Sequence, residues 1–352
     1  MATQTATELL PLEPPIAVSG SESRSHDPNV DFEDSSAVAT ADEATTTNVV
    51  LPKGRAVIVI TQVCGVQFFS SFCSGILVIA LPAIQSTLSI EQALLVWPTS
   101  SYYLAAGSCL LLTGAIADVT GPKRVNLVGC FLGAVSALAC GLSQSGGEII
   151  AFRAIQGVTN AIQTPSSISI ISSSVEDGQP RNIGLSCLGL SLPFGFGFGL
   201  VLAGVLTDTV GWRPAFYLAA AASLVLSVIG IWALPKDSRP DAGHAVWKRM
   251  ISEIDWVGLM LATTGLATLS YVLASLSADI NSIHNVANIV LLAISVLSIP
   301  SYVAWMHRQV KLNRTALIPN ALWRSHVFTS CCIMVLLTNA LTNCMELYSS
   351  LL

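Results

Sequence analysis

The strongest constraint on the fold is a series of nine long apolar blocks that fill the chain beyond residue 55. They cover residues 56–90, 92–117, 125–147, 149–175, 182–207, 214–235, 256–278, 285–306 and 327–352. A helix needs about 20 apolar residues to cross the hydrocarbon core of a bilayer, and every block reaches that length. Only 11% of all residues are charged, whereas about a quarter is usual in soluble domains. The sequence therefore predicts an all-α polytopic membrane protein in contact with a lipid bilayer.

The positively charged residues predict the orientation of the chain. Lys and Arg concentrate in the cytoplasmic loops of membrane proteins. With the N-terminus inside, all 16 of these residues face the cytoplasm except Arg153, within a block, and Arg213, in an outer loop. The opposite orientation would reverse this distribution. We therefore expect a cytoplasmic N-terminus, in the plasma membrane or, as the alternative, in the vacuolar membrane.

The segment before the first block differs from the rest in composition. Residues 1–50 hold nine of the 21 acidic residues and one cation, Arg24, without hydrophobic periodicity. Such a segment cannot bury enough apolar surface to offset the entropy that folding costs. We expect residues 1–54 to form a disordered, acidic cytosolic tail.

The patterns that accompany enzymatic chemistry are missing from the sequence. It contains no phosphate-binding glycine loop, metal-ligand spacing or nucleophile–base set, and the five histidines are scattered over the tail and loops. All nine cysteines lie inside apolar blocks, where cysteine behaves as a small packing residue. We therefore expect no enzyme, no cofactor, no metal site and no nucleic-acid partner.

The turn between the second and third blocks carries glycine and charged residues at regular spacing. The set is Gly114, Asp118, Gly121, Lys123 and Arg124. Glycine lets helices approach closely in lipid, and paired cations mark a cytoplasmic loop. The spacing resembles the loop between helices two and three of the major facilitator superfamily. This resemblance implies a transporter in which the five residues control a cytoplasmic gate.

The fourth block is the most polar, and its polar residues recur at helical spacing. They are Arg153, Gln156, Asn160 and Gln163, followed by Thr164 and Ser167. Residues spaced by three, four and seven share one helix face. Because an arginine in hydrocarbon must face protein or water, the stripe indicates either a solvated pathway, which we favour, or interhelical hydrogen bonds. The segment from Arg153 to Gly157 also resembles a superfamily motif, which implies that Arg153 acts in proton coupling and in the central cavity.

The fifth block combines a proline with two rows of small residues. One row holds Gly189, Pro193, Gly197 and Gly204, and the adjacent row holds Gly195, Gly199 and Ala203. Small residues permit tight helix crossings and proline kinks a helix, so packing alone can explain both rows. The segment nevertheless resembles the fifth-helix motif of drug:proton antiporters, which implies transport out of the cell.

Two other blocks supply further candidates for a polar cavity. Gln67 and Ser74 lie on a polar face of the first block, and Asn339, Asn343 and Glu346 are spaced by four and three in the ninth. An ionisable residue inside a membrane is a functional candidate. Glu346 lies close to the expected outer interface, so a simple interfacial acid is an equal alternative.

Cys73 marks a departure from the antiporter pattern. Aligned on the segment Ala80-Leu81-Pro82, this cysteine replaces the acidic residue that is common in the fourteen-helix antiporters. The first six blocks then contain no carboxylate. These blocks therefore offer no acidic side chain that could bind a proton within the membrane.

Residues 55–352 resemble the fourteen-helix drug:proton antiporters of the fungal toxin-efflux and aminotriazole-resistance type. The implied organisation is a six-helix half at 55–235, a linker with an interfacial helix at 236–254 and two inserted helices at 255–309. A cytoplasmic loop at 310–326 and the first helix of a second half at 327–352 follow. Five helices of that half are absent, so we expect a truncated product or a chain that works only with another chain.

The resemblance implies export of small organic compounds, such as drugs, toxins or secondary metabolites, by proton-coupled antiport. In alternating access, two helical halves rock around a midplane site. The expected partners are the bilayer, protons and a small organic substrate. The alternative is a non-transporting membrane protein that associates with, or regulates, a full-length carrier.

Overall fold

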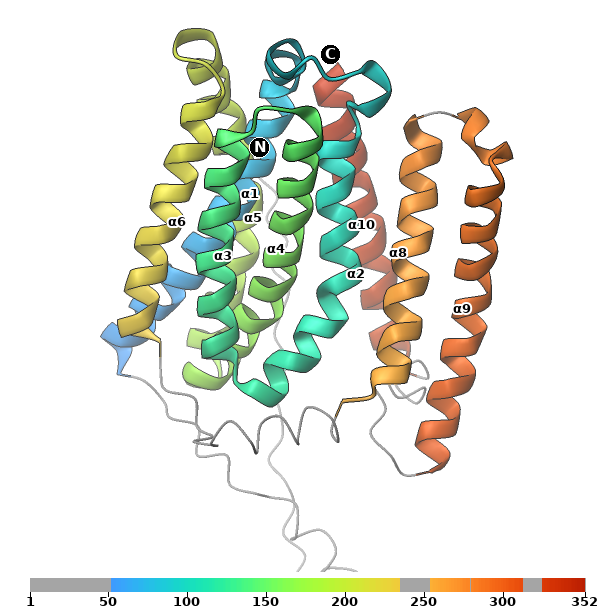
Figure 1. Cartoon of the computed structure of the whole chain (residues 1–352). Helices are drawn as coiled ribbons and strands as arrows, with labels where there is room; N and C mark the ends of the chain where they lie inside the picture. Colours follow the sequence, from blue (N-terminus) through green and yellow to red (C-terminus); the bar gives the residue numbers. More distant parts are fainter. Residues whose placement is uncertain (1–51, 235–253, 279, 313–324, 352) are drawn as a thin grey trace, which may run out of the picture. The chain divides into compact units, whose positions relative to one another are not determined.

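A computed structural model describes residues 52–234, 254–278, 280–312 and 325–351, with side chains to residue 341 in the last segment. The long helices in these segments are α1 (Lys53–Leu88), α2 (Trp97–Thr120), α3 (Pro122–Leu142), α4 (Gly146–Ser174), α5 (Gln179–Thr209), α6 (Arg213–Ala233), α8 (Trp256–Ala278), α9 (Val286–Lys311) and α10 (His326–Leu351) (Figure 1). Each predicted block corresponds to one of them, so the all-α fold is confirmed. Of the predicted tail only residues 52–54 are described, and α1 already begins at Lys53; the predicted linker helix, apart from Ile254, lies outside the described residues.

Seven of the described helices are long and apolar enough to cross a membrane: α1, α2, α3, α5, α6, α8 and α9. Helix α4 has 29 residues, enough to span, but its polar stripe lowers its hydropathy below that of the others. In α10 the part with described side chains, His326–Leu341, is apolar but shorter than these seven helices. Lipid tolerates a polar helix only where neighbouring helices cover it, and α2 and α3 both pack along α4.

Three tight turns between helices depend on glycines with positive φ. Gly121 (φ 100°) separates α2 from α3, Gly178 (φ 105°) precedes α5, and Gly211 (φ 98°) precedes α6. A side chain at such a φ costs about 1–2 kcal/mol, so these positions favour glycine. A proline follows in the first turn of each of the three helices, where its missing N–H and its restricted φ cause no loss.

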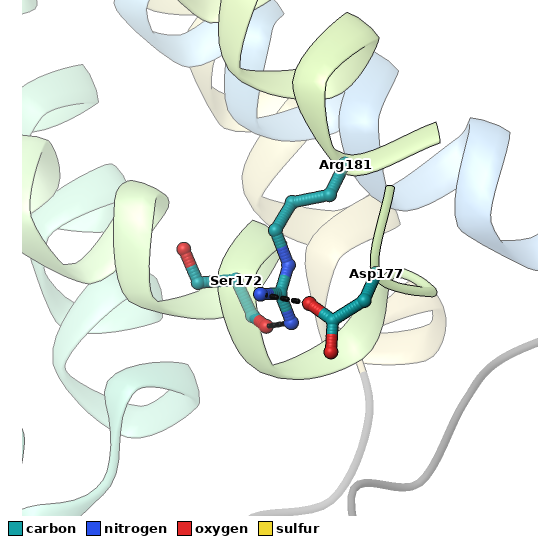
Figure 2. Close-up of polar contacts among 3 residues, drawn as sticks. All are labelled: Ser172, Asp177 and Arg181. Atoms are coloured by element: carbon teal, nitrogen blue, oxygen red, sulfur yellow. Dashed lines mark hydrogen bonds and ion pairs between the residues drawn. The ribbon is translucent and has the colours of Figure 1, made fainter. Parts of the chain in front are cut away.

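The turn between α4 and α5 is also held by a charged side chain. Arg181, in the first turn of α5, forms an ion pair with Asp177 and donates a hydrogen bond to the carbonyl oxygen of Ser172 (Figure 2). The carbonyl groups at a helix C-terminus lack partners within the helix and carry partial negative charge. A cation at the end of α4 therefore stabilises both the helix and the turn.

The first six helices pack through four main contacts: α1 with α5, α2 with α4, α3 with α4, and α3 with α6. A buried cluster holds Phe72 and Ile76 of α1 against Phe216 of α6 and Ile149 of α4. A second cluster places Val59 and Val63 of α1 against Ile170 and Ile171 of α4 and Leu188 of α5. Helix α1 thus lies at the centre of the apolar contacts of this half.

Helices α8 and α9 form a hairpin that packs beside α2 (Figure 1). The carboxylate of Asp255 accepts hydrogen bonds from the backbone N–H of Gly258 (3.0 Å) and from the indole N–H of Trp305 (3.0 Å). It therefore caps α8 and ties it to α9. Val119 of α2 packs with Ile254 and Leu259, so the hairpin meets α2 near the turn at Gly121.

The α1–α5 crossing is close because glycines face one another across it. A Cβ atom at Gly195 would overlap the carbonyl oxygen of Phe68 and lie 2.9 Å from its carbonyl carbon, and one at Gly199 would lie 3.2 Å from the Cα of Gly75. By contrast, a Cβ at Gly189, Gly197 or Gly204 would meet nothing within 4 Å. Only one of the two small-residue rows in α5 therefore makes the tight crossing.

We predict that Gly195→Ala separates α1 from α5 and destabilises the bundle by about 1–3 kcal/mol, the usual cost of overpacking. Gly197→Ala is the matched control, because alanine adds helix propensity there without a clash. Thermal unfolding of the detergent-solubilised protein measures both. Equal melting temperatures for the two variants would show that the crossing is not close.

Candidate functional site

Arg153 is the only fully buried charged residue among the described side chains, with 0% of its surface exposed. Its guanidinium donates hydrogen bonds to the carbonyl oxygen of Pro98 (3.4 Å), to Gln156 Oε1 (2.5 Å) and to Ser74 Oγ (3.3 Å). It also lies 4.5 Å from the ring centroid of Tyr102. These contacts join α4 to α1 and α2, so the arginine sits where the three helices meet.

The groups around Arg153 are neutral. A serine hydroxyl, an amide oxygen, a backbone carbonyl and a tyrosine ring surround it, and the described residues give it no ion pair. Removing an ion from water costs several kcal/mol, and a desolvated cation–π contact returns about 2 kcal/mol. The site therefore holds a positive charge that dipoles solvate and that no described carboxylate neutralises.

The polar network continues along the contact between α1 and α4. The Ser70 hydroxyl lies 3.3 Å from the Tyr102 hydroxyl and donates to Asn160 Oδ1 (3.3 Å). One turn further along α4, Gln67 donates to Thr164 Oγ1 (3.2 Å). The predicted residues Gln67, Ser74 and Asn160 are thus brought together with Arg153 on one seam.

Cys73 lies beside this network. Cys73 is buried, and it lines a small cavity together with Gln156, the residue that accepts a hydrogen bond from Arg153. Position 73, which aligns with the acidic residue of the antiporter pattern, therefore lies near Arg153. A carboxylate at this position would lie within electrostatic range of the guanidinium.

Gln163 points away from Arg153, toward α3. Its Nε2 donates to the carbonyl oxygen of Gly129 (2.9 Å), while its Oε1 is buried without a hydrogen-bond partner. A small cavity of about 10 Å³, lined by Gln163, Gln156 and Cys73 among others, adjoins it. That volume holds about one water molecule. Gln163 therefore belongs to the α3–α4 contact rather than to the Arg153 cluster.

A second buried polar contact was missed by sequence reasoning. Asn126 of α3 donates to the hydroxyls of Ser166 and Ser167 of α4, both at 3.1 Å, and Gln62 of α1 approaches Cys130. Within its apolar block no polar residue follows Asn126 at a spacing of three, four or seven, so no periodic pattern marked it. A lone asparagine in a membrane span signals a hydrogen-bond partner on another helix.

Gly157 explains how α2 comes close enough to reach the site. A Cβ atom there would overlap the carbonyl oxygen of Tyr102. Because glycine has no side chain, the backbone of α2 lies directly against α4, and the Tyr102 ring reaches Arg153. Gly157 is therefore a packing residue that positions Tyr102.

The predicted gate residues lie around the α2–α3 turn. The Lys123 ammonium donates to the carbonyl oxygen of Leu234 (2.7 Å), at the end of α6, and thereby joins the turn to that helix. Asp118 and Arg124 are exposed, and both take part in further interactions. A Cβ at Gly114 would lie 3.9 Å from the side chain of Pro165 on α4, an ordinary van der Waals distance.

The remaining candidates are separate from this cluster. Gly189 and Pro193 are exposed on α5. Asn339 is exposed on α10, and its side chain donates to the carbonyl oxygen of Val335 in the same helix. The side chains of Asn343 and Glu346 lie outside the described residues. Among the described residues no three His, Cys, Asp or Glu side chains group as metal ligands.

A family model described as Major Facilitator Superfamily matches residues 63–352. The chain belongs to this superfamily.

Curated relatives have names that refer to transport or resistance. The chain is 34% identical over 328 residues to "MFS-type transporter 1" of Pyricularia oryzae, covering 86% of this chain and 53% of the relative. It is 30% identical over 231 residues to the "Aminotriazole resistance protein" of Saccharomyces cerevisiae, covering 64% of this chain and 40% of the relative. For the cephamycin export protein of Amycolatopsis lactamdurans the identity is 32% over 209 residues, covering 59% of this chain and 41% of the relative. The chain thus spans about half the length, or less, of these relatives.

Among solved structures, the human organic anion transporter MFSD10 matches with a TM-score of 0.47 and 18% identity, over 62% of this chain and 55% of that one.

We predict that Cys73→Asp stabilises the superfamily bundle relative to Cys73→Asn, because only the carboxylate can pair with the Arg153 guanidinium. Hydrogen bonds to charged groups contribute about 1.5–3 kcal/mol. Asparagine matches aspartate in size and is the control for packing. Thermal unfolding of both variants, alone and combined with Arg153→Gln, gives the coupling energy. If the difference between Asp and Asn persists without Arg153, the two side chains do not interact.

Proposed function

We propose that this chain acts in the export of small organic compounds by proton-coupled antiport, through alternating access. The single observation that supports it most directly is the buried Arg153. Within membrane-spanning segments an ionisable residue is costly and marks substrate or ion pathways, and this one is solvated by polar groups of three helices. The names of relatives that refer to resistance and export support the outward direction.

The fourteen-helix branch belongs to the same proposal. Along the chain, α8 and α9 follow the first six helices and precede α10. Two inserted central helices would occupy this place in the sequence. We propose the six-helix half at 55–235, the linker at 236–254, the inserted pair at 255–309, the loop at 310–326 and a further helix at 327–352. The distribution of Lys and Arg supports a cytoplasmic N-terminus, and a plasma-membrane exporter would have this orientation.

The residues have distinct proposed roles. Arg153, Gln156 and Asn160 line the pathway, and Asp118, Lys123 and Arg124 control its cytoplasmic side. Gly195 and Gly199 hold α5 tightly against α1, so that the two helices move together. Substrate and protons would reach the region of α1, α2 and α4 when the two helical halves rock relative to one another.

We expect that expression in a transporter-deficient host lowers cellular retention of a fluorescent drug, and that Arg153→Lys removes this effect. Lysine keeps the charge but loses the fork of donors and the planar stacking of arginine. An increase of about 1.4 kcal/mol in the activation free energy corresponds to tenfold slower efflux. Arg308→Lys is the matched control, since Arg308 also stacks on an aromatic ring, 5.6 Å from that of Trp305, but on α9.

Unchanged retention on expression of the unmodified chain, with delivery to the cell surface confirmed, would contradict export. Co-purification of a second membrane carrier in that case would support the alternative of an associating or regulatory chain. Equal effects of the two arginine variants would contradict the role of Arg153.

We predict that a protonophore, which collapses the proton gradient, restores drug retention to the level of cells without the protein. The measurement is retention before and after addition, at constant ATP. Efflux that persists without the gradient would contradict proton coupling and leave export itself supported.

A further inference from the structure

An apolar groove lies between α2 and α3, on the side of the turn at Gly121. It has a volume of about 310 Å³ and is lined by Thr113, Ile116, Thr120, Arg124, Val125, Val128 and Ile162. Both α2 and α3 pack on α4 but make few contacts with one another. They therefore leave a furrow whose floor is Ile162 of α4.

The polar atoms at the walls of this furrow are already used within the protein. The Thr113 hydroxyl donates to the carbonyl oxygen of Ala161 (2.7 Å), and the Thr120 hydroxyl donates to that of Ile116. The walls consequently present methyl and methylene groups, and the exposed lining is apolar. An occupant has to be a hydrocarbon chain rather than a polar molecule.

The groove opens to the side of α3 that the described residues leave uncovered. Val128 is 61% exposed and Phe131 57% exposed, and further apolar residues continue along this face. In a membrane protein such a face contacts lipid tails. Thr113 and Thr120 are seven residues apart, so the groove runs roughly 10 Å along the helix, within the roughly 15 Å depth of one leaflet of the hydrocarbon core.

Arg124 closes the end of the groove at the α2–α3 turn. Its side chain is exposed, and although it interacts within the chain, a guanidinium has five N–H donors and can serve a second partner. Lys123 beside it is directed to the carbonyl oxygen of Leu234. A hydrocarbon furrow that ends at an exposed arginine matches a phospholipid with an anionic headgroup.

We infer that this groove binds one acyl chain of an anionic phospholipid from the cytoplasmic leaflet, with the headgroup at Arg124. The inference rests on the proposed cytoplasmic position of the turn and is independent of transport. Anionic lipids are concentrated in that leaflet and attract basic residues at its surface. Bound lipid would hold α2 and α3 at a fixed separation next to the proposed gate.

The test is lipid retention by the full purified chain, measured by native mass spectrometry after exchange into phosphatidylserine or phosphatidylcholine of identical chains. We expect the unmodified chain to retain phosphatidylserine preferentially. Arg124→Gln should lower this preference at least threefold, and Arg124→Lys should restore most of it. Arg181→Gln is the matched control, because Arg181 lies at another helix turn and is paired with Asp177.

The apolar part of the site is tested by Val128→Phe, which fills the groove at an exposed position. We expect weaker retention of both lipids, whereas Val135→Phe, on the same face of α3 but outside the groove, leaves retention unchanged. Equal retention by Arg124→Gln and the unmodified chain would overturn the inference. So would displacement of the lipid by glycerophosphoserine, which carries the headgroup without acyl chains. Lipid retention is measured without any drug efflux. A failure of the lipid inference is therefore distinguishable from a failure of the proposed transport.

Discussion

The buried positive charge of Arg153 sets the conditions that the surrounding helices have to meet. Hydrocarbon offers no water to solvate a guanidinium, so the protein supplies the polar groups. The hydroxyl of Ser74, the amide of Gln156, the carbonyl of Pro98 and the ring of Tyr102 come from three helices. These contacts require α1, α2 and α4 to meet at one depth, and they explain why the most polar helix is covered by its neighbours.

The glycines of the bundle make this meeting of helices geometrically possible. Gly157 lets the backbone of α2 lie on α4, and Gly195 and Gly199 let α5 lie on α1. Because the hydrophobic effect does not drive association between helices inside lipid, close backbone packing and hydrogen bonds take its place. Replacing one of these glycines therefore affects the polar cluster through the helix spacing, without touching Arg153 itself.

Much of this arrangement is predictable from the sequence, with limits that have physical causes. The nine apolar blocks predicted the helices, and the stripe from Arg153 to Asn160 predicted a polar face of α4. The stripe did not separate Asn160, which bonds to α1, from Gln163, which bonds to α3. Periodicity gives the direction of a side chain around its own helix and contains no information on which helix lies opposite. Asn126 was missed because a single polar residue forms no periodic pattern.

The sequence by itself determined that the chain is helical and suited to a membrane. Each block is long and apolar enough to span a bilayer, and in lipid a helix forms all of its backbone hydrogen bonds within the segment. It also marked Gly121 as a turn residue through its place between two apolar blocks. Only the tertiary structure decided that Gly195 and Gly199, rather than Gly189 and Gly197, make the close crossing in α5. It likewise placed Cys73 beside Arg153. Both results depend on how helices distant in sequence pack together, and packing is a property of the assembled bundle.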